Sequence, residues 1–153
     1  TIERCESLYA ASDVPFLTAF TNLADGEKGN RLKDESGQTV SPSDQPVMYA
    51  TAMLKLYKDH GGNAWLKRYF RYLQQCPRVK VRTRDDALDQ SLNWLVAASA
   101  AAGQDLTPVF VDRWRMPMSD KLRAALGNVD WSIRSIHAGR VIKRVNAPAA
   151  RGV

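Results

Sequence analysis

Apolar side chains recur at intervals of three and four residues through most of the chain, which is the spacing of one face of an α-helix. The segments that carry this pattern are 2–11, 16–25, 46–59, 64–76, 86–102, 108–114 and 119–127. Asn63 is expected to cap the helix that follows it, and Ser119 to start the last one. Gly61 and Gly62 can end the 46–59 helix in a left-handed conformation, Gly103 ends the 86–102 helix, and the last helix stops at Gly127, which suits the C′ position. The pattern therefore predicts a mainly α fold, a single compact domain of several helices packed like a bundle.

The stretch 104–127 predicts two short helices joined by a corner. Pro108 suits the first position of a helix, where a missing N–H costs nothing. The link 116–118 has proline at its centre, and the residue before a proline avoids the α region, so this link should be extended.

The first of these short helices is too apolar to be exposed. We expect Trp114 to be largely buried between the 46–59 helix and the alanine-rich end of the 86–102 helix, where small side chains leave room for an indole. Asp112 and Arg113 should then point outward into solvent.

Three segments break the helical pattern. Residues 26–46 contain three glycines, two prolines and many charges, which predicts one long loop. Residues 78–84 alternate between apolar and basic, the period of an exposed strand, so they form either a short strand or an extended connector. Residues 131–153 offer few apolar side chains. We therefore divide the chain into a helical domain, 1–130, and a basic, partly extended or disordered C-terminal tail, 131–153.

The net charge of +6 is unevenly placed, because no acidic residue follows Asp130. The basic residues beyond it are Arg134, Arg140, Lys143, Arg144 and Arg151. Such a tail can contact nucleic acid or an acidic membrane, or it can be solvated or pack on a neighbour. No apolar run approaches the ~20 residues of a membrane helix, so we expect no membrane span.

The 64–76 helix interleaves aromatic and basic residues. Its rings could stack on nucleobases beside the cationic groups. Alternatively, it is a core helix whose basic side chains extend along its flanks to solvent. The candidate nucleic-acid contacts under the first interpretation are Lys67, Arg68, Arg71, Lys80, Arg82, Arg84, Lys143 and Arg144.

Residues for catalysis, cofactor binding or metal binding are not apparent in the sequence. The histidines His60 and His137 are far apart, and no HExxH motif occurs. The cysteines Cys5 and Cys76 are too few for a zinc site, but they could form a disulfide if the first helix packs antiparallel to the end of the 64–76 helix. The sequence thus predicts no catalytic, cofactor or metal residue in this chain.

A set of residues within 46–122 resembles the helical C-terminal portion of enhancin-like zinc metallopeptidases of the gluzincin type. These residues are Tyr57, Gly61, Gly62, Trp65, Tyr72, Leu73, Pro77, Leu92, Trp94, Leu95, Asp105, Leu106, Thr107, Pro108, Phe110, Trp114, Pro117 and Ser119. In that family one helix carries HExxH, a later helix supplies a third, glutamate ligand, and a helical subdomain follows. This chain lacks the zinc motif, and Arg115 stands where the family tends to have glycine.

The resemblance implies a helical subdomain that serves as a scaffold or as a wall of the substrate groove, without catalysis of its own. It further implies zinc only in a region upstream, a partner that is the rest of the parent chain or another protein, and a secreted or periplasmic location. Whether the chain belongs to an active enzyme or to an inactive relative is left open. The alternative is an autonomous basic helical module that binds nucleic acid or another protein.

Overall fold

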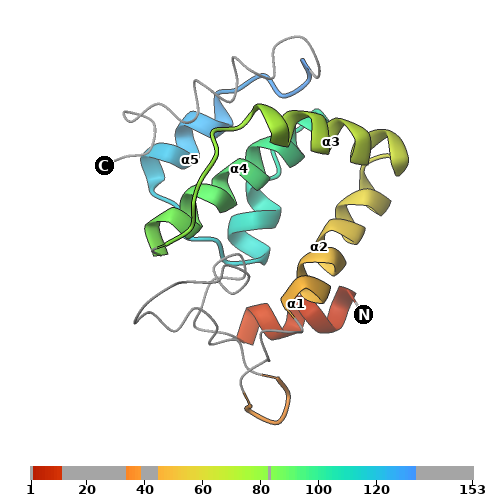
Figure 1. Cartoon of the computed structure of the whole chain (residues 1–153), viewed down its shortest axis with the longest axis vertical. Coiled ribbons are helices and arrows are strands. Elements are labelled where there is room, and N and C mark those ends of the chain that lie inside the picture. The colour runs from red at the N-terminus through yellow and green to blue at the C-terminus, as the bar shows by residue number, and fades with distance from the viewer. Residues whose placement is uncertain (1, 12–33, 39–44, 83, 134–153) are drawn as a thin grey trace.

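The computed structural model describes residues 2–11, 34–38, 45–82 and 84–133 (Figure 1). The helices of this part of the chain are α1 (Ile2–Ala11), α2 (Gln45–Asp59), α3 (Asn63–Gln75), α4 (Arg84–Ala102), η3 (Pro108–Arg113) and α5 (Asp120–Gly127). The prediction of a mainly α domain is confirmed.

The pairing of α3 with α4 is the most extensive contact between helices in the described structure. The alanines at the end of α4 are buried, and their small side chains let α3 approach the backbone of α4 closely. As a result, the Trp65 indole N–H donates to the carbonyl of Ala98 at 3.3 Å, and Arg68 Nε donates to that of Ala101 at 2.9 Å. The alanine-rich stretch of α4 therefore receives α3, including the indole of Trp65.

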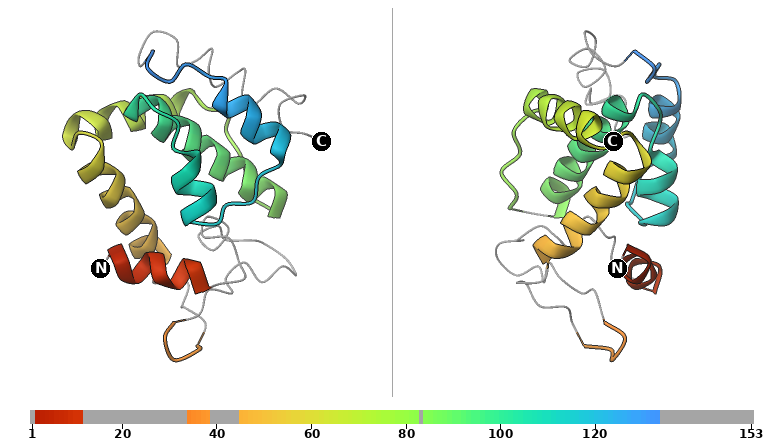
Figure 2. Two further views of the ribbon diagram at one scale, coloured as in Figure 1. Left: turned by 180° about the vertical axis from the view of Figure 1, so that it is seen from behind. Right: turned by 90° about the vertical axis from the view of Figure 1, so that its right-hand side faces the viewer.

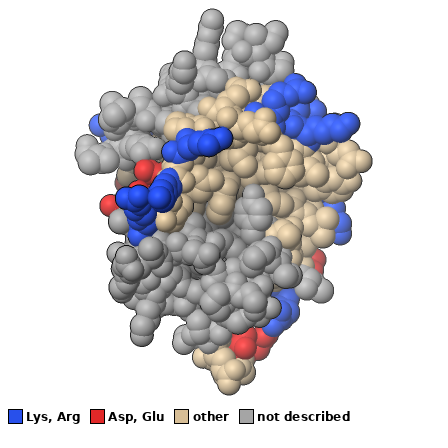
Figure 3. All heavy atoms as spheres, viewed as in Figure 1, with Lys and Arg blue, Asp and Glu red and all other residues tan. Residues whose placement is uncertain are grey.

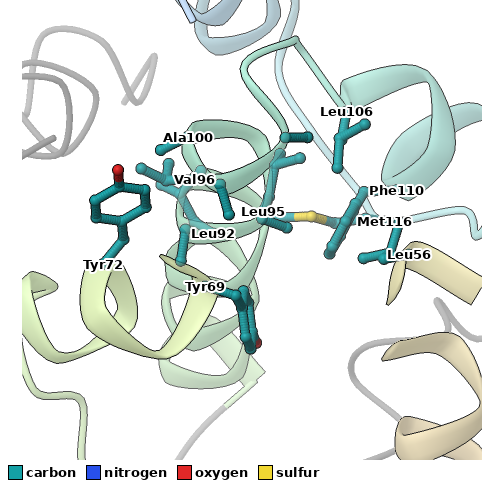
Figure 4. Close-up of a cluster of buried hydrophobic side chains, with 14 of the residues drawn as sticks. Leu56, Tyr69, Tyr72, Leu92, Leu95, Val96, Ala100, Leu106, Phe110 and Met116 are labelled. Carbon is teal, nitrogen blue, oxygen red and sulfur yellow. The ribbon is translucent and has the colours of Figure 1, made fainter. Parts of the chain in front are cut away.

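Leucine, valine and aromatic side chains fill the space between the helices (Figure 4). Tyr69 and Tyr72 extend from α3 towards α4, and both are fully buried. On the other side of α4, Leu95 lies beside Met116 and Phe110. This single cluster joins α2, α3, α4, η3 and the link after η3 into one core.

Trp114, which directly follows η3, has no exposed surface, so its predicted burial is confirmed. Its ring lies 4.9 Å from that of Phe110, and its indole N–H donates to the Glu6 carboxylate of α1 at 3.2 Å. Residues of α2, including Ala52, line a small pocket together with Trp114 and residues of α1. Of the two neighbours predicted for Trp114, α2 is present, whereas the alanine-rich end of α4 receives Trp65 and Arg68 of α3. The contact with α1, which crosses the start of α2 in Figures 1 and 2, was not expected.

The helix ends follow the predicted local chemistry in part. Ser119 Oγ accepts a hydrogen bond from the Leu122 N–H at 3.1 Å, as a capping residue should. Gly103 has φ 70°, and its N–H returns to the carbonyl of Ser99. α5 ends at Gly127 as predicted, but Gly127 is its last helical residue and not the C′ residue, and its φ is not positive.

The cap predicted at Asn63 is also wrong. Gly62 occupies the cap position of α3 with φ 64°, and Asn63 is the first helical residue. Its side-chain carbonyl instead accepts a hydrogen bond from the Tyr57 hydroxyl at 3.0 Å. The two glycines at 61–62 make a turn tight enough for the end of α2 to bond to the start of α3.

Residues 77–82 form an extended connector between α3 and α4 and belong to no strand; within the described ranges no β-ladder occurs. The strand predicted at 78–84 is therefore wrong, and the connector alternative holds. The reason is that side chains of α4 take the place of a partner strand. Asn93 Nδ2 donates to the carbonyl of Pro77 at 2.9 Å, and Asp86 Oδ2 accepts from the N–H of Arg82 at 2.9 Å.

Several predictions fall outside the described residues. These are the helix at 16–25, the loop at 26–46 apart from a turn at 34–38 and its last two residues, and the tail beyond residue 133. Those last two residues, 45 and 46, begin α2, so the loop is shorter there than predicted. In the turn, the Asp34 carboxylate accepts from the N–H groups of Ser36 and Gln38 at 2.9 and 3.0 Å. No helix in the described segments has the length and apolar character that crossing a membrane requires.

Arg115 turns the chain after η3 with φ 59°, a conformation that costs a non-glycine residue about 1–2 kcal/mol. Glycine avoids this strain but loses about 0.5–1 kcal/mol through the entropy of the unfolded chain. We therefore expect Arg115→Gly to raise the free energy of unfolding by about 0.5 kcal/mol in urea denaturation. Arg113→Gly, inside η3, is the control and should lower the same quantity by about 1 kcal/mol. Loss of stability in both variants would contradict the strained turn.

Candidate nucleic-acid interface

The two cysteines are free thiols in separate environments. Cys5 lies on α1 beside Trp114, and α1 packs against α2 and η3, so the disulfide that the sequence left open does not form. The Cys76 thiol lies near the carbonyls of Tyr72 and Asn93, at 3.5 and 3.8 Å. Burial raises the pKa of Cys76 to about 12, so this thiol is neutral at physiological pH. Over the described residues, no group of three histidine, cysteine or acidic side chains is arranged to hold a metal ion.

Positive charge is concentrated in the segment between Asp59 and Asp85. The sequence between them contains no acidic residue. Its basic residues are Lys67, Arg68, Arg71, Arg78, Lys80, Arg82 and Arg84. Arg78 was not among the residues singled out in the sequence, although the absence of acidic neighbours is a signal that would have found it.

The fold brings five of these side chains to the surface. Lys67 and Arg71 are exposed one turn apart on α3, and Arg78, Lys80 and Arg82 are exposed along the connector. We call these five residues the basic surface. In Figure 3, Lys and Arg side chains lie over α3 and over the connector, with acidic side chains only at the edges of this area.

The other candidate nucleic-acid contacts predicted from the sequence do not belong to the basic surface. Arg68 is half-buried, and its bond to the Ala101 carbonyl holds it in the interface between α3 and α4, in agreement with the core-helix interpretation for this residue. The side chain of Arg84 lies outside the described structure, as do Lys143 and Arg144.

A groove of about 960 Å³ lies between the connector and α4, at the C-terminal end of α3. Alternate residues of the connector divide between the two sides: Val79 and Val81 are half-buried along the groove, whereas Lys80 and Arg82 point to solvent. Gln74 and Trp94 form part of the other walls. The groove therefore combines apolar, amide and cationic groups beside the basic surface.

Phe70 is an exposed aromatic residue on α3, with 52% of its surface accessible. Its ring meets the edge of Tyr69 at 5.4 Å, and Tyr69 stacks on Trp65 at 5.1 Å with an angle of 13°. Phe70 lies three residues after Lys67, so the two share the outer part of the helix. Two apolar stripes run along this helix, one of Trp65, Tyr69 and Tyr72 and the other of Leu66, Phe70 and Leu73. The structure fully buries the first.

Acidic residues mark where the basic surface ends. Asp85 and Asp86 occupy the first turn of α4, and Asp89 follows one turn later. The Asp86 carboxylate accepts the backbone N–H of Arg82. The cationic area thus extends from Lys67 on α3 to the connector and stops at the start of α4.

Comparison with models of protein families, with curated proteins and with solved structures finds no match for this chain. The subdomain role implied by the resemblance to enhancin-like metallopeptidases therefore stays a prediction.

Proposed function

We propose that this domain binds nucleic acid, holding the phosphate backbone on the basic surface of α3 and the connector. The observation that carries the proposal is the gathering of five exposed Lys and Arg side chains on a segment that contains no acidic residue. Neutralising phosphates releases the counterions condensed on them, and this release supplies the free energy of sequence-independent binding.

The distribution of charge supports this proposal over that of an ordinary solvated face. Soluble surfaces usually intersperse both signs of charge, as α5 does with exposed Asp120, Lys121 and Arg123. The segment between Asp59 and Asp85 carries positive charge only, and among its described cationic side chains Arg68 is the one shown bonded to a helix carbonyl. The exposed groups come from a helix and an extended connector, so they can follow a flexible polyanion along its length.

Binding is expected to depend steeply on salt. We would titrate the protein into labelled oligo(dT) of about 15 nucleotides and follow fluorescence anisotropy between about 50 and 200 mM salt. Five phosphate contacts predict a slope of log K against log salt of about −3.5, since each contact on a single strand contributes about −0.7. The Lys67→Ala/Arg71→Ala variant should bind more weakly, with a slope shallower by about 1.4.

Lys121→Glu provides the matched control. Lys121 is exposed on α5, away from the basic surface, and its reversal changes the net charge by the same amount as the two neutralisations. The control should keep most of the affinity. Failure to bind at low salt, or an equal loss in the control, would contradict the proposal.

A further inference from the structure

We infer that the nucleic acid taken by this surface is single-stranded, with unpaired bases stacked on Phe70 and admitted to the groove beside Trp94. This inference rests on the proposed function and narrows it to one class of nucleic acid.

The first support is the setting of Phe70. Phe70 is 52% exposed and contributes little to the core, and its ring makes an edge contact with Tyr69, which in turn stacks on Trp65. An accessible ring flanked by Lys67 and Arg71 is the combination that single-strand binding proteins use, with the base on the ring and the phosphates on the cations.

The groove gives the second support. Leu73 and Gln74 line its α3 wall, and they lie three and four residues after Phe70, which is one helical turn away. A strand stacked on Phe70 can therefore continue into the groove. There Trp94 offers an aromatic surface and Arg78 a guanidinium group, with Gln90 adding an amide.

A duplex would not use these features. Its bases are already paired and stacked, so their faces are closed to an exposed ring, and only its phosphates can meet the basic surface. The aromatic groups therefore favour the single strand, whereas the cations are shared by both forms.

The test compares labelled oligo(dT) with a duplex of the same length at one salt concentration, using the full chain and the Phe70→Leu variant. Phe70→Leu should weaken oligo(dT) binding about 5- to 100-fold, the effect of one base–aromatic stack. Binding of the duplex should change by less than about twofold, since its phosphate contacts remain.

A second measurement, of tryptophan fluorescence, reports on the groove itself. Of the four tryptophans, Trp65, Trp114 and Trp131 are buried, so quenching of tryptophan fluorescence by oligo(dT) should come from Trp94 and disappear in Trp94→Phe. Equal affinity for both DNA forms, with Phe70→Leu neutral and no quenching, would overturn this inference. The proposed function would still hold if Lys67→Ala/Arg71→Ala weakened binding. If the protein bound neither oligo(dT) nor the duplex, both the single-strand inference and the proposed function would be overturned.

Discussion

Trp114→Ala is expected to lower the free energy of unfolding by about 3–5 kcal/mol, the range for emptying a large aromatic site. The indole has no exposed surface, contacts the Phe110 ring and donates to the Glu6 carboxylate. Its removal leaves a cavity between η3, α1 and α2 and deprives Glu6 of a hydrogen-bond donor. Since domains are stable by about 5–15 kcal/mol, this is a large share of the total.

Urea denaturation followed by circular dichroism measures this loss. Trp114→Phe keeps an aromatic ring but removes the donor to Glu6, so it should fall between the wild type and Trp114→Ala. Arg113→Ala is the surface control. Its guanidinium is half exposed and lies 3.7 Å from Glu6, so its removal should cost about 1 kcal/mol or less. If Trp114→Ala denatures like Arg113→Ala, the indole is outside the core and the docking of α1 onto η3 is wrong.

The parts of the fold that could be predicted from the sequence are those decided within a few residues. Ser119 caps α5 because its hydroxyl reaches the N–H three residues later, and Gly103 ends α4 because it adopts a positive φ. The extended link after Trp114 follows from Pro117 in the same way. Each depends on the chemistry of one residue and its immediate neighbours.

The sequence pattern alone could not predict which distant segments pack against each other. The alanines of α4 predict that some helix approaches closely, but they carry no information on which one does. Similarly, the alternation at 78–82 correctly divides half-buried Val79 and Val81 from exposed Lys80 and Arg82. It does not show whether a partner strand is present, and here α4 side chains bond the connector instead.

The basic residues of the candidate interface could be predicted from the sequence, but its exposed aromatic residue could not. Lys67 and Arg71 were expected at the surface because few unpaired cations are buried. Phe70 was overlooked because α3 has two apolar stripes, and either could face the core. Trp65 donates to the Ala98 carbonyl of α4 and Tyr69 stacks on Trp65, and this long-range fit leaves Phe70 outside.

Trp65→Ala is the second variant with a large expected effect, a loss of about 3–5 kcal/mol. Trp65 is fully buried at the closest approach of α3 to α4, where it stacks on Tyr69 and donates to the Ala98 carbonyl. Alanine at this position would face alanine across the interface, so neither helix could fill the cavity. The same urea denaturation measures this loss.

Phe70→Ala is the matched comparison, an aromatic truncation on the same helix. It removes an exposed ring and one edge contact, so it should cost about 1 kcal/mol or less. A difference of about 2 kcal/mol or more between the two variants is therefore the expected result. Equal losses would mean that α3 is rotated about its axis, with Phe70 in the core. Phe70 would then be unable to stack on a base, so this comparison tests the fold and the single-strand inference together.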